Sequence, residues 1–430
     1  MKTIFNNLSD TLDYLSKNDK SSENKVLNLS QCNFCFDLDL YELFFSLKES
    51  NYIFSHLSFK NSDFQNPVNL FLSNQQSIDF NLDFYKCHFL DTFEFRGVEL
   101  CENLSFIDTI FEKNVEFSEL VFKKGLRLSG ASFHANLTFA HLELNNRSIF
   151  FTKIDDRTKF EGNLYFFNVV FNDARFWDFI FLHDVFFQNT IFNCPAQFNN
   201  SKFLGKTVLK SIETIGLTEF KNKVYFDNAE INDLNLINIV FDKVVSFNYA
   251  TIKNISIENV HCYGFPLSLV GTNIGNVTNE GTARFLKSEA MKSNDPFLIA
   301  ELNTKEMNMH YKKLRWRNRT EFFDKIILFF NKYSTNFGER WQQGVGFILL
   351  SGALSFSSII MLRDGIGSTF IWFDKQYLKE ALEFLWLFGS LKVLGDSYGL
   401  PEILMFILGK IFIVYGVYQT IAAFRKYGRK

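Results

Sequence analysis

Phenylalanine and leucine recur every five or six residues through the N-terminal part of this chain, and this spacing limits the fold more than any other feature. The run begins at Phe84 and continues through Phe89, Phe95, Leu100, Phe106, Phe111, Phe117, Phe122, Leu128, Phe133, Phe139, Leu144 and Phe150. The double step of eleven residues fits neither the 3.6-residue period of an amphipathic helix nor the two-residue alternation of a half-buried strand. A short period repeated over about two hundred residues is typical of a solenoid.

A second position keeps the same spacing, because a small or aliphatic residue stands two places before each aromatic one. The pairs are Leu104/Phe106, Thr109/Phe111, Val115/Phe117, Leu120/Phe122 and Ala131/Phe133, and then, after a slip near Asp155, Leu164/Phe166, Val169/Phe171, Ala174/Phe176, Val185/Phe187, Ala196/Phe198 and Ser201/Phe203. Because the two positions recur in register many times, the chain resembles pentapeptide-repeat proteins, in a Phe-rich variant, over roughly Leu27 to Cys262. The resemblance implies a mainly β solenoid, a right-handed quadrilateral β-helix with Phe or Leu pointing to its axis.

The remaining sequence divides into flanking regions. Residues 1–26 carry leucines at helical spacing and are expected to form an N-terminal cap, and residues 27–275 the β-helix. The repeat is least regular between Tyr41 and Asp83, where a cap or bulge is expected. Residues 276–342 are expected to form a helical cap with a basic juxtamembrane linker, and residues 343–430 an α-helical membrane domain.

Two helices are expected after the repeats, separated by the turn Asn294-Asp295-Pro296. Arg284–Lys287 and Glu306–Met307 resemble a helical segment that follows the solenoid in membrane-linked pentapeptide-repeat proteins. That resemblance implies a cap that closes the end of the β-helix and leads to the membrane.

Two apolar stretches are long enough to cross a bilayer. Gly344–Leu362 contains no charged residue, and Ile403–Phe424 contains only Lys410. Basic residues precede the first stretch and follow the second, so the positive-inside rule places both ends of the hairpin in the cytoplasm. Because residues 1–20 contain no apolar signal region, the sequence predicts a cytoplasmic (inner) membrane protein with its solenoid and both termini in the cytoplasm.

The repeat region and the C-terminal region differ in net charge, which indicates what each of them can bind. Residues 27–275 contain 29 acidic and 20 basic residues, whereas residues 276–430 contain 14 acidic and 21 basic residues. The basic residues expected to face lipid are Lys312, Lys313, Arg315, Arg317 and Arg319. Nucleic acid is the other interpretation of such a run, but its place beside a span favours lipid, and the acidic solenoid is a poor nucleic-acid binder.

The segment between the spans is expected to hold an interfacial or re-entrant helix at about 374–391, with Tyr377, Leu378, Ala381, Leu382, Leu385 and Trp386 on one face. The order of span, short helix, turn and span resembles two-span pore-loop channels. The residues expected to line a pore or lie within the membrane are Lys410, Gln419, Gly395, Asp396 and Tyr398. Potassium selectivity does not carry over, because Ser397 interrupts the required run of filter carbonyls. Lys410 has two interpretations, a functional membrane-embedded charge or a side chain that extends to the outer interface.

No enzymatic motif is recognised, and no cofactor or metal is expected. Cys32 and Cys35 form a lone C-x-x-C without the second ligand pair that zinc requires, and Cys32 falls in the small slot before Phe34. The first functional hypothesis is a membrane-anchored scaffold or sensor with a protein partner on the solenoid. The alternative is a homo-oligomeric ion channel or pore-forming effector gated by the solenoid, and a remote alternative is a DNA-mimicking gyrase inhibitor.

Overall fold

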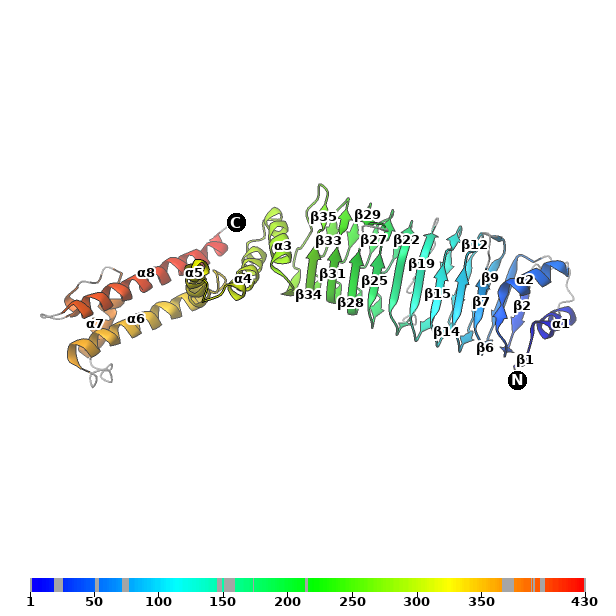
Figure 1. Ribbon diagram of the computed structural model, residues 1–430, viewed down its shortest axis with the longest axis horizontal. Coiled ribbons are helices and arrows are strands. Elements are labelled where there is room, and N and C mark those ends of the chain that lie inside the picture. Colours follow the sequence, from blue (N-terminus) through cyan, green and yellow to red (C-terminus); the bar gives the residue numbers. More distant parts are fainter. Residues whose placement is uncertain are drawn as a thin grey trace. The chain divides into compact units, whose positions relative to one another are not determined.

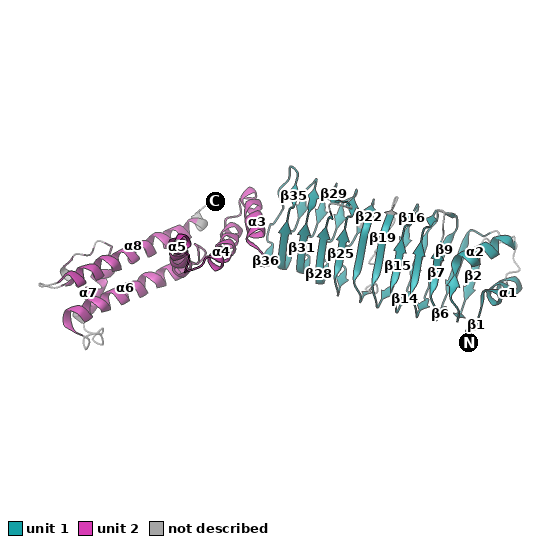
Figure 2. Ribbon diagram, in the orientation of Figure 1, with its two compact units in different colours: residues 1–278 teal, residues 279–430 magenta. Residues whose placement is uncertain are grey.

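The computed structural model describes residues 2–18, 26–50, 54–71, 77–144, 149–150, 159–172, 174–212, 216–365, 375–387, 389, 391–394 and 399–428. It contains two compact units, Met1–Thr278 and Asn279–Lys430 (Figure 2). The first consists mainly of parallel strands, and the second is helical and ends with two long apolar helices. The structure therefore confirms the predicted order of a β region followed by apolar helices.

Strands of the first unit pair in parallel with strands further along the chain, and the paired strands lie side by side along the unit (Figure 1). Leu82 pairs with Leu104, 22 residues later, and Val115 pairs with Leu137, also 22 residues later. This distance equals two of the eleven-residue double steps. The period read from the sequence is therefore the spacing between residues that contact one another on neighbouring strands.

Among the described residues, one sheet has ten strands and the other has 26. The ten are β2 (Val26–Ser30), β5 (His56–Lys60), β9 (Asn81–Tyr85), β13 (Leu104–Ile107), β17 (Leu126–Arg127), β20 (Ile149–Phe150), β23 (Ala174–Arg175), β27 (Ala196–Gln197), β30 (Val224–Tyr225) and β33 (Val245–Ser246). The larger sheet contains β1 (Thr3–Phe5), β3 (Cys32–Phe34), β4 (Leu38–Asp39), β6 (Asp63–Phe64), β7 (Val68–Phe71), β8 (Ser77–Ile78), β10 (His88–Phe89), β11 (Phe93–Arg96), β12 (Glu99–Leu100), β14 (Ile110–Phe111), β15 (Val115–Ser118), β16 (Val121–Phe122), β18 (Ser132–Phe133), β19 (Leu137–Leu144), β21 (Lys159–Phe160), β22 (Leu164–Phe171), β24 (Ile180–Phe181), β25 (Val185–Gln188), β26 (Ile191–Phe192), β28 (Lys202–Lys210), β29 (Thr218–Phe220), β31 (Glu230–Ile237), β32 (Ile239–Phe241), β34 (Thr251–Glu258), β35 (His261–Cys262) and β36 (Asn273–Val277).

The recurrent phenylalanines form the core of this unit. Rings on paired strands stack with nearly parallel planes. The centroids of Phe84 and Phe106, for example, are 5.0 Å apart and their planes are 5° apart. Within the described residues such stacks follow four columns, represented by Phe59/Phe84/Phe106, Phe64/Phe89/Phe111/Phe133, Phe139/Phe166/Phe187 and Phe171/Phe192/Phe220/Phe241. These side chains are at most 1% exposed. Each offset ring pair adds about 0.5–1.5 kcal/mol beyond area burial, so every column of rings stabilises the stacking of successive strands.

Asparagine occupies several of the turns between strands. Asn61, Asn189 and Asn200 have φ values of 51°, 53° and 56°, in the left-handed region. Asparagine tolerates this conformation better than most residues because its side chain bonds locally. The asparagines between the aromatic positions are therefore suited to these turns.

The first unit begins with an element that the repeat pattern did not indicate. β1 pairs in parallel with β3, with Thr3 opposite Cys32, and helix α1 (Leu8–Asn18) follows it. The irregular segment after Tyr41 contains helix α2 (Leu40–Glu49), which starts where the Asp39 carboxylate accepts hydrogen bonds from two backbone N–H groups. The aromatic period is interrupted there because a helix is inserted between β4 and β5.

The second unit contains helices α3 (Glu280–Lys292), α4 (Pro296–Lys313), α5 (Arg319–Thr335), α6 (Trp341–Asp364), α7 (Lys375–Leu385) and α8 (Leu400–Gly428), and the short 3-10 helix η2 (Leu391–Leu394). Within the described part of the chain, α6 and α8 are the two helices long and apolar enough to cross a membrane. They pack closely at glycines: a Cβ on Gly409 would lie 2.6 Å from the Ser355 Cβ atom, and one on Gly416 would lie 2.6 Å from Ile348. Small residues allow such an approach between helices in lipid.

Candidate functional site

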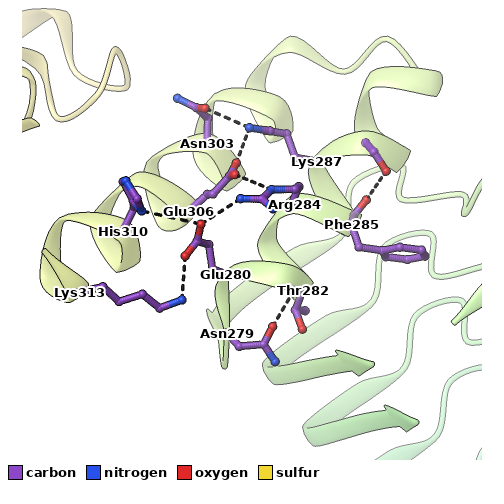
Figure 3. Close-up of polar contacts among 11 residues, drawn as sticks. Asn279, Glu280, Thr282, Arg284, Phe285, Lys287, Asn303, Glu306, His310 and Lys313 are labelled. Atoms are coloured by element: carbon purple, nitrogen blue, oxygen red, sulfur yellow. Dashed lines mark hydrogen bonds and ion pairs between the residues drawn. The ribbon is translucent and has the colours of Figure 1, made fainter. Parts of the chain in front are cut away.

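An ionic cluster joins α3 to α4 (Figure 3). Arg284 Nε lies 3.1 Å from the Glu306 carboxylate, and Lys287 Nζ contacts the other oxygen of that carboxylate. Arg284 and Lys287 lie three residues apart on α3 and so share one face of that helix. The Glu306 side chain is 5% exposed, so its charge is neutralised inside the helix pair. The residues that the sequence singled out at 284–287 and 306 are thus brought together.

Glu280 extends the cluster toward the basic segment. Its carboxylate lies 2.9 Å from Arg284 Nη2 and 2.8 Å from Lys313 Nζ. The hydrogen bond from Lys313, with the charge of that ammonium, lowers the pKa of Glu280 below its ordinary value. Sequence reasoning missed Glu280, although its position four residues before Arg284 on a helix is a recognisable ion-pair spacing.

The predicted lipid-facing residues lie at the end of α4 and in the segment that follows it. Lys312, Lys313, Arg315 and Arg317 are exposed, and Arg319 begins α5. Lys313 also bonds Glu280, so its charge is shared with the cluster. Trp316 and Phe323 are 46% and 69% exposed beside these cations. Basic residues next to exposed aromatic ones are typical of segments that lie on a membrane surface.

Lys410 of α8 is bonded to the end of α7. Its ammonium donates hydrogen bonds of 2.6 Å to the carbonyl oxygens of Phe384 and Trp386, and it lies 5.1 Å from the centroid of the Phe384 ring. The last carbonyls of a helix have no intrahelical partners and carry partial negative charge. Lys410 therefore caps the short helix, a role that neither sequence interpretation included.

α7 packs through only part of the predicted face, since Tyr377, Ala381 and Leu385 pack into the core of the second unit. Ala381 and Phe384 are buried, whereas Leu378, Leu382 and Trp386 are more than half exposed. The predicted face combined residues that lie on two sides of the helix, and Phe384 was missed. Burial follows contact with α6 and α8, which hydropathy alone does not specify. Arg363 of α6 forms a 3.1 Å ion pair with Glu380, near the middle of α7.

Gln419 belongs to a polar cluster between α8 and α5. Its Nε2 atom donates to Asn331 Oδ1 at 2.8 Å, and the Tyr415 hydroxyl donates to the same oxygen at 2.7 Å. Thr335 donates to Gln419 Oε1 at 3.4 Å. Of the residues predicted to line a pore, Lys410 and Gln419 thus bond neighbouring parts of their own unit. Gly395, Asp396 and Tyr398 lie outside the described residues.

The first unit carries an aromatic patch on the outside of its larger sheet, formed by Tyr165, Phe167 and Phe186. The rings of Tyr165 and Phe186 stack with centroids 5.0 Å apart and planes 6° apart, and the centroids of Tyr165 and Phe167 are 5.8 Å apart. All three side chains are half-buried and alternate with the inward residues of their strands. Following the strand register, the row of Phe186 and Tyr165 leads through Thr138 to Glu116 and Glu94.

The first cysteine of the C-x-x-C pair is a core residue. Cys32 is fully buried, and desolvation raises the pKa of its thiol to about 11, which disfavours the reactive thiolate. Within the described residues, no group of three or more His, Cys, Asp or Glu side chains is arranged to hold a metal ion.

Comparison with known proteins gives no relative. The chain matches no protein-family model, no curated protein and no solved structure.

Proposed function

We propose that this protein is a membrane-anchored interaction scaffold of the pentapeptide-repeat kind. In this proposal the first unit is a right-handed quadrilateral β-helix in the cytoplasm, and α6 and α8 form a hairpin in the inner membrane with both chain termini on the cytoplasmic side. The parallel pairing at 22 residues and the four columns of stacked rings support the β-helix. The length and apolarity of α6 and α8, with basic residues before and after them, support the hairpin.

The aromatic patch is the observation that carries the scaffold function. Inward residues such as Phe187 already form the core, so the outward rings of Tyr165 and Phe186 are available to a partner. Large rigid aromatic side chains are enriched at protein interfaces because they bury much area at low entropic cost. Glu94 and Glu116 in the same outward row give the surface a negative edge. The proposed partner is a protein with an apolar centre flanked by basic residues.

Site-specific photocrosslinking of the full-length protein in native membranes tests this proposal. A photoreactive phenylalanine analogue at position 186 is expected to capture a discrete partner, and the same analogue at Asn235, in the same outward row, is the matched control. The variant Tyr165→Ser/Phe186→Ser is expected to lose co-purification of the captured partner at unchanged protein level. Equal capture from both positions, or a partner retained by the double variant, would contradict the scaffold.

A multimeric pore is the second candidate, and the observation that favours it is α7. This short helix packs against α6 and α8, the arrangement by which two-span channels support a pore loop. Ion flux into liposomes that contain the full-length protein separates the two candidates. A flux that changes in Lys410→Ala supports the pore, whereas sealed liposomes with confirmed insertion leave α6 and α8 as an anchor.

A further inference from the structure

We propose that the second unit binds an anionic phospholipid at the basic end of α8. The head group would occupy a cleft between α4, α5 and α8, and the acyl chains would follow an apolar groove along α8. This inference rests on the membrane insertion contained in the proposed function.

The cleft has the polarity that a phosphate head group requires. Its volume is about 1030 Å³, and its polar lining includes Asn303, Asn331, Gln419 and Arg425. No described residue that lines it is acidic. Arg425 is exposed and lines the cleft, and within the described residues no carboxylate forms an ion pair with it, so its guanidinium is available to a ligand. The planar guanidinium matches phosphate geometry with paired hydrogen bonds.

Two amides supply further donors. Asn331 Oδ1 accepts hydrogen bonds from Tyr415 and Gln419, which fixes the orientation of the side chain. Asn303 Oδ1 accepts from Lys287 in the same way, at 3.4 Å. Within the described part of the chain, the NH₂ groups of both asparagines have no acceptor. Together with Arg425, they give the cleft a cation and two neutral donors for phosphate and ester oxygens.

An apolar groove lies along α8, on residues that precede those of the cleft in the sequence. Its volume is about 610 Å³. Phe406, Lys410 and Tyr415 line part of it, and the rest is lined by Ile407, Ile411, Val414 and Tyr418. The last four residues and Arg425 follow one another at steps of four, three, four and seven, so they share one helix face. The groove ends at Tyr418, and the polar cleft begins at Gln419. A ligand that fits both is polar at one end and apolar along its length, as a phospholipid is.

The position along α8 agrees with a head-group site. The apolar stretch of α8 ends at Arg425, and the Phe424 ring stacks on Trp341 at the start of α6 with centroids 4.9 Å apart. Aromatic residues at the ends of spans mark the level of the lipid head groups. Basic pockets between membrane helices on the cytoplasmic side are suited to anionic head groups.

Lipid retention measured by native mass spectrometry tests the inference. The full-length protein is reconstituted in vesicles of equal parts phosphatidylglycerol and phosphatidylcholine, extracted in mild detergent, and analysed for bound lipid. We expect phosphatidylglycerol to be retained at least tenfold over phosphatidylcholine. Arg425→Gln is expected to lower that retention about tenfold, and Lys379→Gln, which removes one exposed positive charge on α7, is expected to leave it unchanged. Equal retention of the two lipids, or unchanged retention in Arg425→Gln, would overturn the inference.

Two further arms separate the alternatives. Glycerol phosphate in millimolar excess should not displace the lipid if the groove contributes; displacement would identify a site for free phosphate compounds and overturn the lipid assignment. Ala422→Trp, which fills the cleft without changing charge, should reduce retention as Arg425→Gln does, and normal retention would count against the cleft. Vesicle flotation is measured on each sample: a protein that floats without lipid preference refutes this inference alone, and one that does not float refutes the membrane anchor as well.

Discussion

Replacing Glu306 with leucine is expected to loosen the α3–α4 pair, because it removes the only carboxylate that the described residues place beside the Lys287 ammonium. Glu306 and Lys287 have side-chain exposures of 5% and 18%, whereas Arg284 is 65% exposed and keeps a second carboxylate, Glu280, at 2.9 Å. The unpaired charge in the variant is therefore mainly that of Lys287, whose remaining contact among the described residues is Asn303 Oδ1 at 3.4 Å.

The magnitude follows from burial. Breaking a buried ion pair by removal of one partner costs about 3–5 kcal/mol. Solvent screens Arg284, so the expected cost of Glu306→Leu is about 2–3 kcal/mol. In Glu306→Leu/Lys287→Met the buried charge is absent on both sides, and replacement of a whole buried pair by apolar residues is often close to neutral. We therefore expect the double variant to be more stable than the single one.

Hydrogen exchange of the full-length protein in detergent measures this local stability without requiring two-state unfolding of both units. A loss of about 2–3 kcal/mol predicts roughly 30- to 150-fold faster exchange of protected amides in α3 and α4. Lys305→Met, which removes the more exposed pair with Glu301, is the control and should change exchange less than about threefold. Wild-type exchange in Glu306→Leu, or exchange in the double variant as fast as in the single one, would refute the reasoning.

Other changes test the helical hairpin and the cluster beside it. Gly409→Val would place side-chain atoms against Phe384 and Ser355 and should cost about 1–3 kcal/mol, seen as faster exchange in α6 and α8; Gly346→Ala, which has no atom within 4 Å of the added Cβ, should change little. Lys410→Met leaves two carbonyls at the end of α7 without their ammonium partner and should speed exchange in α7 by roughly 10- to 100-fold, so exchange at the wild-type rate would contradict the capping role. The lowered pKa of Glu280 means that its carboxylate stabilises the folded state at pH values above 4.5, its ordinary pKa, and that this contribution is lost as the pH falls through the lowered pKa. The difference in melting temperature between wild type and Glu280→Gln should thus be present at neutral pH and vanish in acid, and a difference that persists in acid would exclude this carboxylate as its source.

The parallel strands could be predicted because their information is local and repeated. An aromatic residue at every fifth or sixth position can be buried only if successive repeats stack, and Phe84 and Phe106 stack as that spacing requires. The apolar helices could also be predicted from the sequence, since length and hydropathy alone identify α6 and α8. β1 was not predicted, because three residues carry no period, and their pairing with β3 depends on a strand almost thirty residues away.

The candidate sites depended on contacts that no local pattern contains. The sequence marked Lys410 as a single charge in an apolar stretch, but only the packing of α7 against α8 brings the carbonyl oxygens of Phe384 and Trp386 to its ammonium. It likewise marked Arg284, Lys287 and Glu306 as a short resemblance, and only the α3–α4 turn makes them one cluster. The outward stack of Tyr165 on Phe186 required the strand register. The sequence by itself determined which positions of the aromatic repeat are buried and which stretches are apolar, because both follow from composition and spacing. The tertiary structure decided which polar groups meet, because hydrogen bonds and ion pairs depend on distances between elements that no spacing along the chain specifies.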